Sequence, residues 1–259
     1  MKKLFALVLA LSLLLPWTAT YGAETAPQSV PLKVAVLTAM NMEARQMRKR
    51  MDNRCPRLSG GRLYTHGTIG DAEVILHHSG MGVALSGRGA RALLEYAKPD
   101  VMILFGVSGG TADFGLFETV VAQSAYAGWD GSRLDMDEAL TALAAQLIED
   151  ATLGPVLTNK LLGAEYGRIP GILASDMESY AVAEAAKEAG VPLLIIRCVS
   201  DTDELLSNLL FPVNGPRAAD KAAAGANYRS VGNYSLEEKV NGKYPTEVML
   251  ERWQRLFGQ

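Results

Sequence analysis

The 259-residue sequence is poor in the side chains that most often bind metals or form disulfides. It has two cysteines and three histidines. His66, His77 and His78 lack a spacing to a carboxylate or thiol that would suit a metal ion, so we interpret them as surface or packing residues. Cys55 lies in a stretch that resembles a loop and Cys198 in an apolar run, and neither has a neighbouring base. We therefore expect neither a disulfide nor a catalytic thiol.

An excess of positive charge is also missing. The formal net charge is −3. The absence of a basic stripe argues against a nucleic-acid polymer as ligand and favours a small molecule. After the N-terminal region, no apolar run is long enough for a membrane helix, so we expect no membrane span in the mature chain.

The N-terminus has the order of charge, apolar core and small residues that is typical of a secretory signal. Two lysines precede an apolar run from Leu4 to Leu15, and small residues end near Ala23. A retained anchor is the alternative, because Tyr21 fits poorly at the −3 position of a cleavage after Ala23. We predict a protein exported to the bacterial periplasm, with a signal peptide at 1–23, a linker at 24–31 and a single domain at 32–259.

Apolar runs alternate with helical patterns along this domain, and we see no internal repeat. Strands are predicted at 33–37, 63–69, 73–77, 100–105, 119–125, 154–158 and 193–199, and helices at 41–51, 84–97, 137–150, 246–256 and from Ser175 or Asp176 to Gly190. We further expect a hairpin around Gly70-Asp71, a glycine-rich bend at 106–110 and a long loop or lid at 205–234. The alternation predicts an α/β fold, a three-layer α/β/α sandwich around a central mixed sheet.

Polar residues at the carboxyl ends of these strands are the candidates for a functional site. They are Glu43 after the first strand, Ser108 in the glycine-rich bend, Ser200 and Asp201 after the strand at 193–199, and Met177 and Glu178 at the start of the preceding helix. The glycine-rich bend offers bare backbone amides to an anion or a sugar.

Each acid also has a purely structural interpretation. Glu43 can complement a helix dipole, Glu178 can be a first-turn capping acid and Asp201 can cap a following helix. Arg197 favours a site, because a guanidinium inside the apolar run 193–199 should be buried and must find an acid or a charged ligand. A structural ion pair with Glu178 remains the alternative. Even that pair would draw Glu178 toward the end of the strand that carries Asp201.

At these residues the sequence resembles the nucleoside phosphorylase superfamily, and most closely its hydrolytic branch, the methylthioadenosine/S-adenosylhomocysteine nucleosidases. The resemblance runs from about Val34 to Asp201. Its best-matched segments are Leu37–Glu43, Ser79–Gly82, Phe105–Gly110, Asp176–Glu178 and Ile196–Asp201. The last two, at their mutual spacing, are fairly specific.

The resemblance implies hydrolysis of the N-glycosidic bond of a purine nucleoside. Asp201 matches the acid that protonates N7 of the base, and Glu43 matches the acid that activates the attacking water. Glu178 matches the carboxylate that binds the ribose hydroxyls. Residues implied to bind or orient the substrate are Met177, Ser200, Arg197, Ser108, Val107, Gly109, and, against the base, Leu161 and Leu162. This chemistry requires no metal or organic cofactor. The resemblance also implies a homodimer or a higher homo-oligomer.

Three departures from the family pattern concern the nucleophile and the substrate's 5′ side. Val107 occupies a position where the family usually has a serine, the stretch at 128–131 is shortened, and the segment after Asp201 differs. A phosphorylase is one alternative, although Arg45 and Arg88 are its only candidate phosphate ligands. A non-catalytic exported nucleoside-binding protein is the other.

Overall fold

The computed structural model describes residues 31–111, 114–148, 150–161, 169–202 and 211–226. The predicted signal peptide and the predicted helix at 246–256 lie outside these ranges. Within them, no helix is both long enough and apolar enough to cross a membrane.

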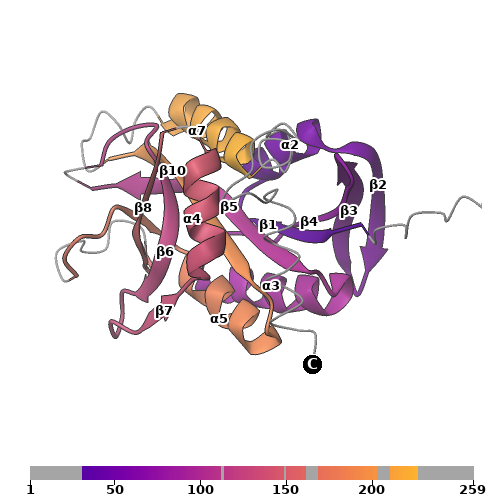
Figure 1. Ribbon diagram of the computed structural model, residues 1–259, viewed down its shortest axis with the longest axis horizontal. Coiled ribbons are helices and arrows are strands. Elements are labelled where there is room, and N and C mark those ends of the chain that lie inside the picture. The colour runs from indigo at the N-terminus through magenta and orange to yellow at the C-terminus, as the bar shows by residue number, and fades with distance from the viewer. Residues whose placement is uncertain (1–30, 112–113, 149, 162–168, 203–210, 227–259) are drawn as a thin grey trace, which may run out of the picture. The chain divides into compact units, whose positions relative to one another are not determined.

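Ten strands of the described chain form one mixed sheet (Figure 1). They are β1 (Lys33–Thr38), β2 (Asp52–Ser59), β3 (Arg62–Ile69), β4 (Ala72–His78), β5 (Val101–Gly110), β6 (Thr119–Ala127), β7 (Arg133–Asp135), β8 (Ala151–Thr158), β9 (Ala174–Asp176) and β10 (Leu193–Asp201). The order is β10-β6-β8-β9-β5-β1-β4-β3-β2, with β7 on β6. Because β10 also pairs with β5, the strands β5, β10, β6, β8 and β9 close into a ring, from which β1, β4, β3 and β2 extend as an open sheet.

Helices cover both faces of the sheet, which confirms the predicted α/β/α sandwich. One face carries α2 (Asn41–Arg50) and α7 (Phe211–Gly225), and the other carries α3 (Val83–Ala97) and α5 (Ser179–Ala189) (Figure 1). A further helix, α4 (Glu138–Leu147), packs against β6 and β8. Alternate strand residues divide between two apolar cores: Val34 and Val36 of β1 face α2, whereas Ala35 and Leu37 face α3.

The predicted hairpin at Gly70-Asp71 is confirmed, since β3 and β4 pair antiparallel across it. The structure adds β2, which the sequence analysis missed, so Cys55 lies in a strand rather than a loop. β2 is the last strand of the sheet order and is exposed on both faces. A strand that buries neither face has no need of alternating apolar residues, and Pro56 is tolerated at an edge.

Two other expectations were wrong. The glycine-rich stretch 106–110 is not a bend, because it continues β5, where it pairs with β10 and β9. The predicted loop at 205–234 contains α7. Pro212 stands in the first turn of α7, where a helix leaves its backbone N–H groups unpaired anyway. Buried alanines, among them Ala218 and Ala222, then pack the helix onto the sheet.

Candidate active site

The predicted site residues come together where β5 and β10 approach their carboxyl ends. The two strands run parallel, with Arg197 opposite Gly106 and Asp201 opposite Gly109. α2 follows β1, and α5 precedes β10, so the first turns of both helices reach this part of the sheet. Glu43 and Glu178 are therefore brought to the same strand pair as Arg197 and Asp201.

Glu43 is fully buried and its carboxylate accepts three backbone hydrogen bonds. Oε2 accepts from the N–H groups of Ala39, at 2.9 Å, and Met40, at 2.8 Å. Oε1 accepts from the N–H of Val107 on β5, at 3.0 Å. Oε2 therefore has the predicted role at the helix start, because it accepts from Met40, the residue that precedes the first turn of α2. The other oxygen joins α2 to the central sheet.

Arg197 is fully buried, as predicted, and it has more than one acidic partner. Its Nη2 lies 2.8 Å from Oδ2 of Asp176 and 3.4 Å from Oε2 of Glu178. It also donates to Ser179 Oγ, at 3.2 Å, and its Nη1 donates to the Val107 carbonyl, at 3.3 Å. The predicted contact with Glu178 is present, but Asp176 is the nearer partner.

Asp176 is an acid that the sequence analysis matched to the family but did not assign to the site. Its Oδ1 accepts hydrogen bonds from Thr158 Oγ1, at 2.8 Å, and from the backbone N–H groups of Glu178 and Ser179. Ser179 Oγ also donates to Oδ2. The predicted helix start at Ser175 or Asp176 was wrong, because both residues lie in β9 and Glu178 is the residue that precedes the first turn of α5. Asp176 nevertheless accepts from the N–H groups at the start of α5, and it also pairs with Arg197. The need of a buried guanidinium for more than one acceptor was the signal that could have identified it.

Gly106 leaves room for this charged cluster. A β-carbon at position 106 would collide with Glu43 Oε1 and with Arg197 Nη1, so both groups lie directly over the glycine. Glu178 lies at the edge of the cluster, where its Oε1 accepts from the N–H of Gly82, at 2.8 Å, in the turn before α3.

Burial and the single guanidinium set the ionisation of the cluster. Burial raises the pKa of Glu43 to about 7, against the opposing effects of Arg197 and of the N–H groups of Val107 and Met40. Burial also raises the pKa of Glu178, while Arg197 lowers it. For Arg197, burial lowers the pKa, but Asp176, Glu178 and Glu43 together raise it further, so it stays charged.

Asp201 and Ser200 lie beside a β-bulge at the end of β10. The pairing with β5 shifts between Val199, opposite Ser108, and Asp201, opposite Gly109. The extra residue, Ser200, is buried; its hydroxyl donates to Asp201 Oδ1 at 2.6 Å, and its Oγ lies 3.3 Å from the Ser108 carbonyl oxygen. Bulges next to functional sites commonly redirect a side chain, and here the bulge gives Asp201 a hydroxyl donor.

Ser108 supplies a buried hydroxyl that has no hydrogen-bond partner within the described part of the chain. It shares a face of β5 with Gly106, the face over which the Arg197 guanidinium lies. Val107 points to the opposite core and contributes its N–H and carbonyl instead. An unpaired buried hydroxyl is costly, which makes Ser108 Oγ a candidate contact for a bound molecule.

The remaining predicted site residues differ in how far their side chains are buried. Met177 is half-buried between Asp176 and Glu178, and Gly109 stands opposite Asp201. Leu161 is exposed just after β8. Leu162 lies outside the described residues. The structure therefore gathers the acids and Arg197 but says nothing of the predicted apolar contact at Leu162.

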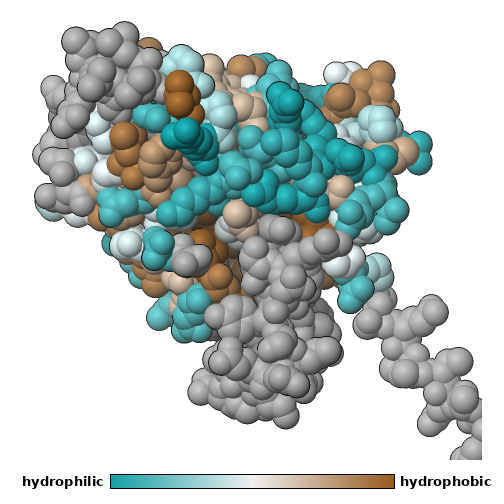
Figure 2. Space-filling view, turned by 90° about the horizontal axis from the view of Figure 1, so that it is seen from above, coloured by the Kyte–Doolittle hydropathy of each residue, from teal (hydrophilic) through white to brown (hydrophobic). Residues whose placement is uncertain are grey.

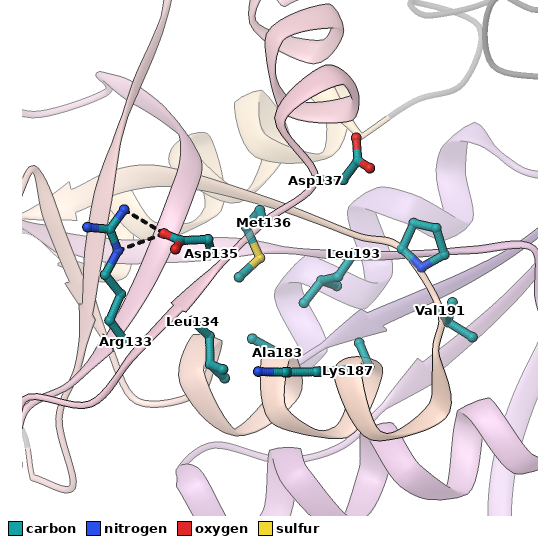
Figure 3. Close-up of a pocket in the computed structure, with 11 residues that line it drawn as sticks. Arg133, Leu134, Asp135, Met136, Asp137, Ala183, Lys187, Val191 and Leu193 are labelled. Carbon is teal, nitrogen blue, oxygen red and sulfur yellow. Dashed lines mark hydrogen bonds and ion pairs between the residues drawn. The ribbon is translucent and has the colours of Figure 1, made fainter. Parts of the chain in front are cut away.

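A cavity elsewhere in the molecule does not belong to this site. It has a volume of about 370 Å³ and lies between β7, the residues before α4, and α5 (Figure 3). Arg133, which pairs with Asp135, and Lys187 line it, together with Leu193 at the start of β10. Asp201 ends the same strand, roughly 26 Å away at a rise of about 3.3 Å per residue. No predicted site residue lines this cavity.

Comparison with known proteins identifies the family. A family model described as the phosphorylase superfamily matches residues 33–165 and 154–226. A 5′-methylthioadenosine/S-adenosylhomocysteine nucleosidase from Streptococcus pneumoniae, solved with a transition-state inhibitor, is 24% identical with a TM-score of 0.70, covering 77% of this chain and 98% of that one.

Two further solved structures have the same fold. An S-adenosylhomocysteine nucleosidase from Streptococcus pyogenes is 23% identical with a TM-score of 0.73, covering 80% of this chain and 98% of that one. Futalosine hydrolase of Helicobacter pylori is 19% identical with a TM-score of 0.69, covering 78% and 97%. The family model spans most of the described residues, and the structures repeat its fold over nearly their whole length. This chain belongs to the phosphorylase superfamily.

Proposed function

We propose that this protein hydrolyses the N-glycosidic bond of a purine nucleoside, with Asp201 as general acid and Glu43 as general base. The observation that carries the proposal is that both acids, Glu43 from α2 and Asp201 from β10, lie against the same stretch of β5. Glu43 accepts from Val107 and Asp201 stands opposite Gly109, two residues further, which is about 7 Å along a strand. A ribose with its base spans a gap of that order.

The reaction balances with the groups present. Asp201 gives a proton to N7 of the purine, so that the N9–C1′ bonding electrons leave with a neutral base. Water attacks C1′ from the opposite side and passes a proton to Glu43. Glu178 accepts hydrogen bonds from the ribose hydroxyls, and its charge, with that of Glu43, stabilises the positive charge that develops on the sugar. Free purine and a ribose derivative are the products.

Several features of the cluster support these roles. A carboxyl group whose pKa is about 7 is a suitable base near neutral pH. Its orientation is set by three backbone N–H donors. Ser200 orients Asp201 through a 2.6 Å hydrogen bond. Asp176 and Arg197 hold Glu178, and the unpaired Ser108 hydroxyl is placed to meet a substrate oxygen or nitrogen.

The charge of the site supports water rather than phosphate as the nucleophile. Three buried carboxylates, those of Glu43, Asp176 and Glu178, surround the one guanidinium of Arg197. An incoming phosphate dianion would be repelled by those acids that are ionised, and Arg197 is already paired with Asp176 and Glu178. The two arginines considered as phosphate ligands, Arg45 and Arg88, are exposed on α2 and α3, and Arg88 donates to the Ala84 carbonyl of its own helix.

The names of the relatives with known structures support a choice of substrate class. Two of those cited are named for methylthioadenosine or S-adenosylhomocysteine, and a third for futalosine. We propose a 5′-substituted purine nucleoside of this kind as substrate. We further propose that the protein acts after export, on the basis of the signal-like N-terminus, and N-terminal sequencing of the secreted or periplasmic protein would test the cleavage near Ala23.

The decisive experiment is release of free base by the purified protein. Adenosine, inosine, methylthioadenosine and S-adenosylhomocysteine would each be incubated with and without phosphate, and the free purine separated and quantified. We expect release without phosphate, loss of it in Asp201→Asn, and no loss in Asp71→Asn, a surface control. Strict dependence on phosphate would indicate a phosphorylase. Tight binding without any release of base would indicate a nucleoside-binding protein.

A further inference from the structure

One segment of the chain concentrates positive charge in a protein whose net charge is negative. Residues 44–63 hold seven Lys and Arg against one Asp, a net charge of +6, whereas the whole chain carries −3. The seven are Arg45, Arg48, Lys49, Arg50, Arg54, Arg57 and Arg62. They come from α2 and the β2–β3 hairpin, which we call the basic segment. Figure 2 shows a largely hydrophilic surface over α2 that continues toward β2.

Most of this charge is available to an outside partner. Arg50 pairs with Asp220 of α7, at 3.0 Å. The other six form no ion pair with an acid in the part of the chain that the structure describes. Arg45 and Lys49 are exposed on α2, and Arg54 and Arg57 are exposed on β2.

Two leucines at the tip of the hairpin are exposed among these charges. Leu58 and Leu63 face each other across β2 and β3 and are 77% and 57% exposed. Gly60 and Gly61, both with positive φ, form the tight turn that joins the strands. Directly opposed residues of an antiparallel pair point to the same side, so the leucines form one apolar point at the tip of the hairpin.

Protection of a sheet edge explains only part of this surface. Arginines and a proline on a terminal strand discourage pairing with other strands, and Arg54, Pro56 and Arg57 fit that purpose. The same arginines would repel a second copy of β2, which argues against a dimer through this edge. Edge protection does not explain why two large apolar side chains stand exposed, nor why the positive charge continues onto α2.

We propose that the basic segment and the Leu58–Leu63 tip form a docking surface for a bilayer of anionic phospholipid. Lys and Arg side chains bind the negatively charged headgroups, and exposed apolar side chains insert into the boundary between headgroups and acyl chains. A polyanion such as nucleic acid would use the charges alone. The bilayer is the partner that uses both the charges and the leucines.

A probe on the hairpin itself tests the proposal. Cys55 is partly exposed on β2 whereas Cys198 is buried, so an environment-sensitive fluorophore can be attached selectively at Cys55 of the full chain. With vesicles rich in phosphatidylglycerol we expect a blue shift and a rise in fluorescence, which high salt removes. Vesicles of pure phosphatidylcholine should give no change. The local probe excludes any signal that arises only from the apolar N-terminal run.

Matched variants assign the binding to the two parts of the surface. Both Leu58→Ser/Leu63→Ser and Arg45→Ser/Lys49→Ser, the latter on α2 and so on the same side of the sheet as the leucines, should weaken vesicle binding about tenfold or more, with unchanged melting temperature. Val213→Ser and Arg88→Ser, which alter exposed residues elsewhere, should bind like the parent protein. Absence of signal with the anionic vesicles, or an equal signal with neutral ones, would overturn the proposal. So would full binding by the leucine variant, because the surface would then recognise any polyanion.

Discussion

Glu43 combines two roles that a sequence reader would treat as alternatives. One oxygen accepts from the residues at the start of α2, and the other accepts from Val107 of the central sheet. Glu43 is fully buried and shares the positive charge of Arg197 with Asp176 and Glu178. Its pKa is therefore about 7 instead of in the acidic range. The residue is therefore both part of the helix terminus and a group that can exchange a proton near pH 7.

This pKa predicts the pH dependence of catalysis. A general base must be ionised, and a carboxyl group with a pKa of about 7 becomes protonated as pH falls below that value. Consequently kcat/KM should decrease on the acidic side of about pH 7. Glu43→Gln should reduce kcat/KM by about 10²- to 10⁴-fold and abolish this limb, whereas Glu95→Gln on the surface of α3 should leave both unchanged. Initial rates of both proteins across the pH range would test this prediction. If Glu43→Gln kept the same acidic limb as the wild type, Glu43 would be excluded as the base.

Ser200 provides a more selective test of the acid. Its hydroxyl bridges the Ser108 carbonyl and Asp201 Oδ1, so Ser200→Ala removes one hydrogen bond to the carboxyl group and leaves the backbone in place. We expect kcat to fall about tenfold, which corresponds to one hydrogen bond to a charged group, with KM nearly constant. Steady-state kinetics beside a melting curve separates this from unfolding. An unchanged kcat with a lowered melting temperature would mean that Ser200 only stabilises the bulge.

Residue patterns predicted part of this site. Burial of Arg197 and its contact with Glu178 followed from a guanidinium within an apolar strand, and both are confirmed. Asp176 as the nearer partner was not predicted, because an acid before a helix has an adequate explanation as a cap. The third acid near the guanidinium, Glu43, approaches through the sheet and not along the chain, and no local spacing encodes that approach.

At the scale of elements, β5 is a strand whose glycines make room for side chains from elsewhere. Gly106→Ala would place a methyl group against Glu43 Oε1 and Arg197 Nη1. Both atoms belong to buried side chains that hydrogen bonds hold in place, so displacing them should lower the activity and also the melting temperature. We expect about a hundredfold loss in kcat/KM, as for other displaced catalytic groups. Gly115→Ala, whose added carbon would meet only Glu118 at 3.6 Å, should be nearly neutral. Equal activity of the two variants would contradict this placement.

Elements were predictable where one face or both faces are buried. Most of the alternating and apolar strands, the β3–β4 hairpin and α3 were predicted close to their observed bounds, although β5 extends to Gly110 instead of ending at residue 105. β2 was missed because it buries neither face, and α7 was missed because Asn214, Gly215 and two prolines occupy its first turns. In α7 the buried alanines decide the outcome through packing, which local propensity does not report.

For the whole molecule, the buried carboxylates predict that stability falls as pH rises. Glu43 in the folded protein holds its proton up to about pH 7, whereas its unfolded value is 4.5, so between these values the folded state binds more protons. Unfolding free energy should therefore decrease across that window, by on the order of 3 kcal/mol from Glu43 alone. The raised pKa of Glu178 acts in the same direction. Denaturant unfolding at several pH values would measure this slope, and Glu43→Gln should flatten it. A wild-type slope of the opposite sign would show that other groups dominate.

The three N–H groups that hold Glu43 have a consequence for how such a sequence can change over time. Ala39, Met40 and Val107 act through the main chain, so replacing their side chains does not remove the donors. Substitutions at these positions are free to reshape the neighbouring surface while the carboxylate keeps its orientation, provided that the strand and the helix start are preserved. An acid anchored in this way tolerates extensive divergence around it, and new substrate preferences can arise without relocating the proton acceptor.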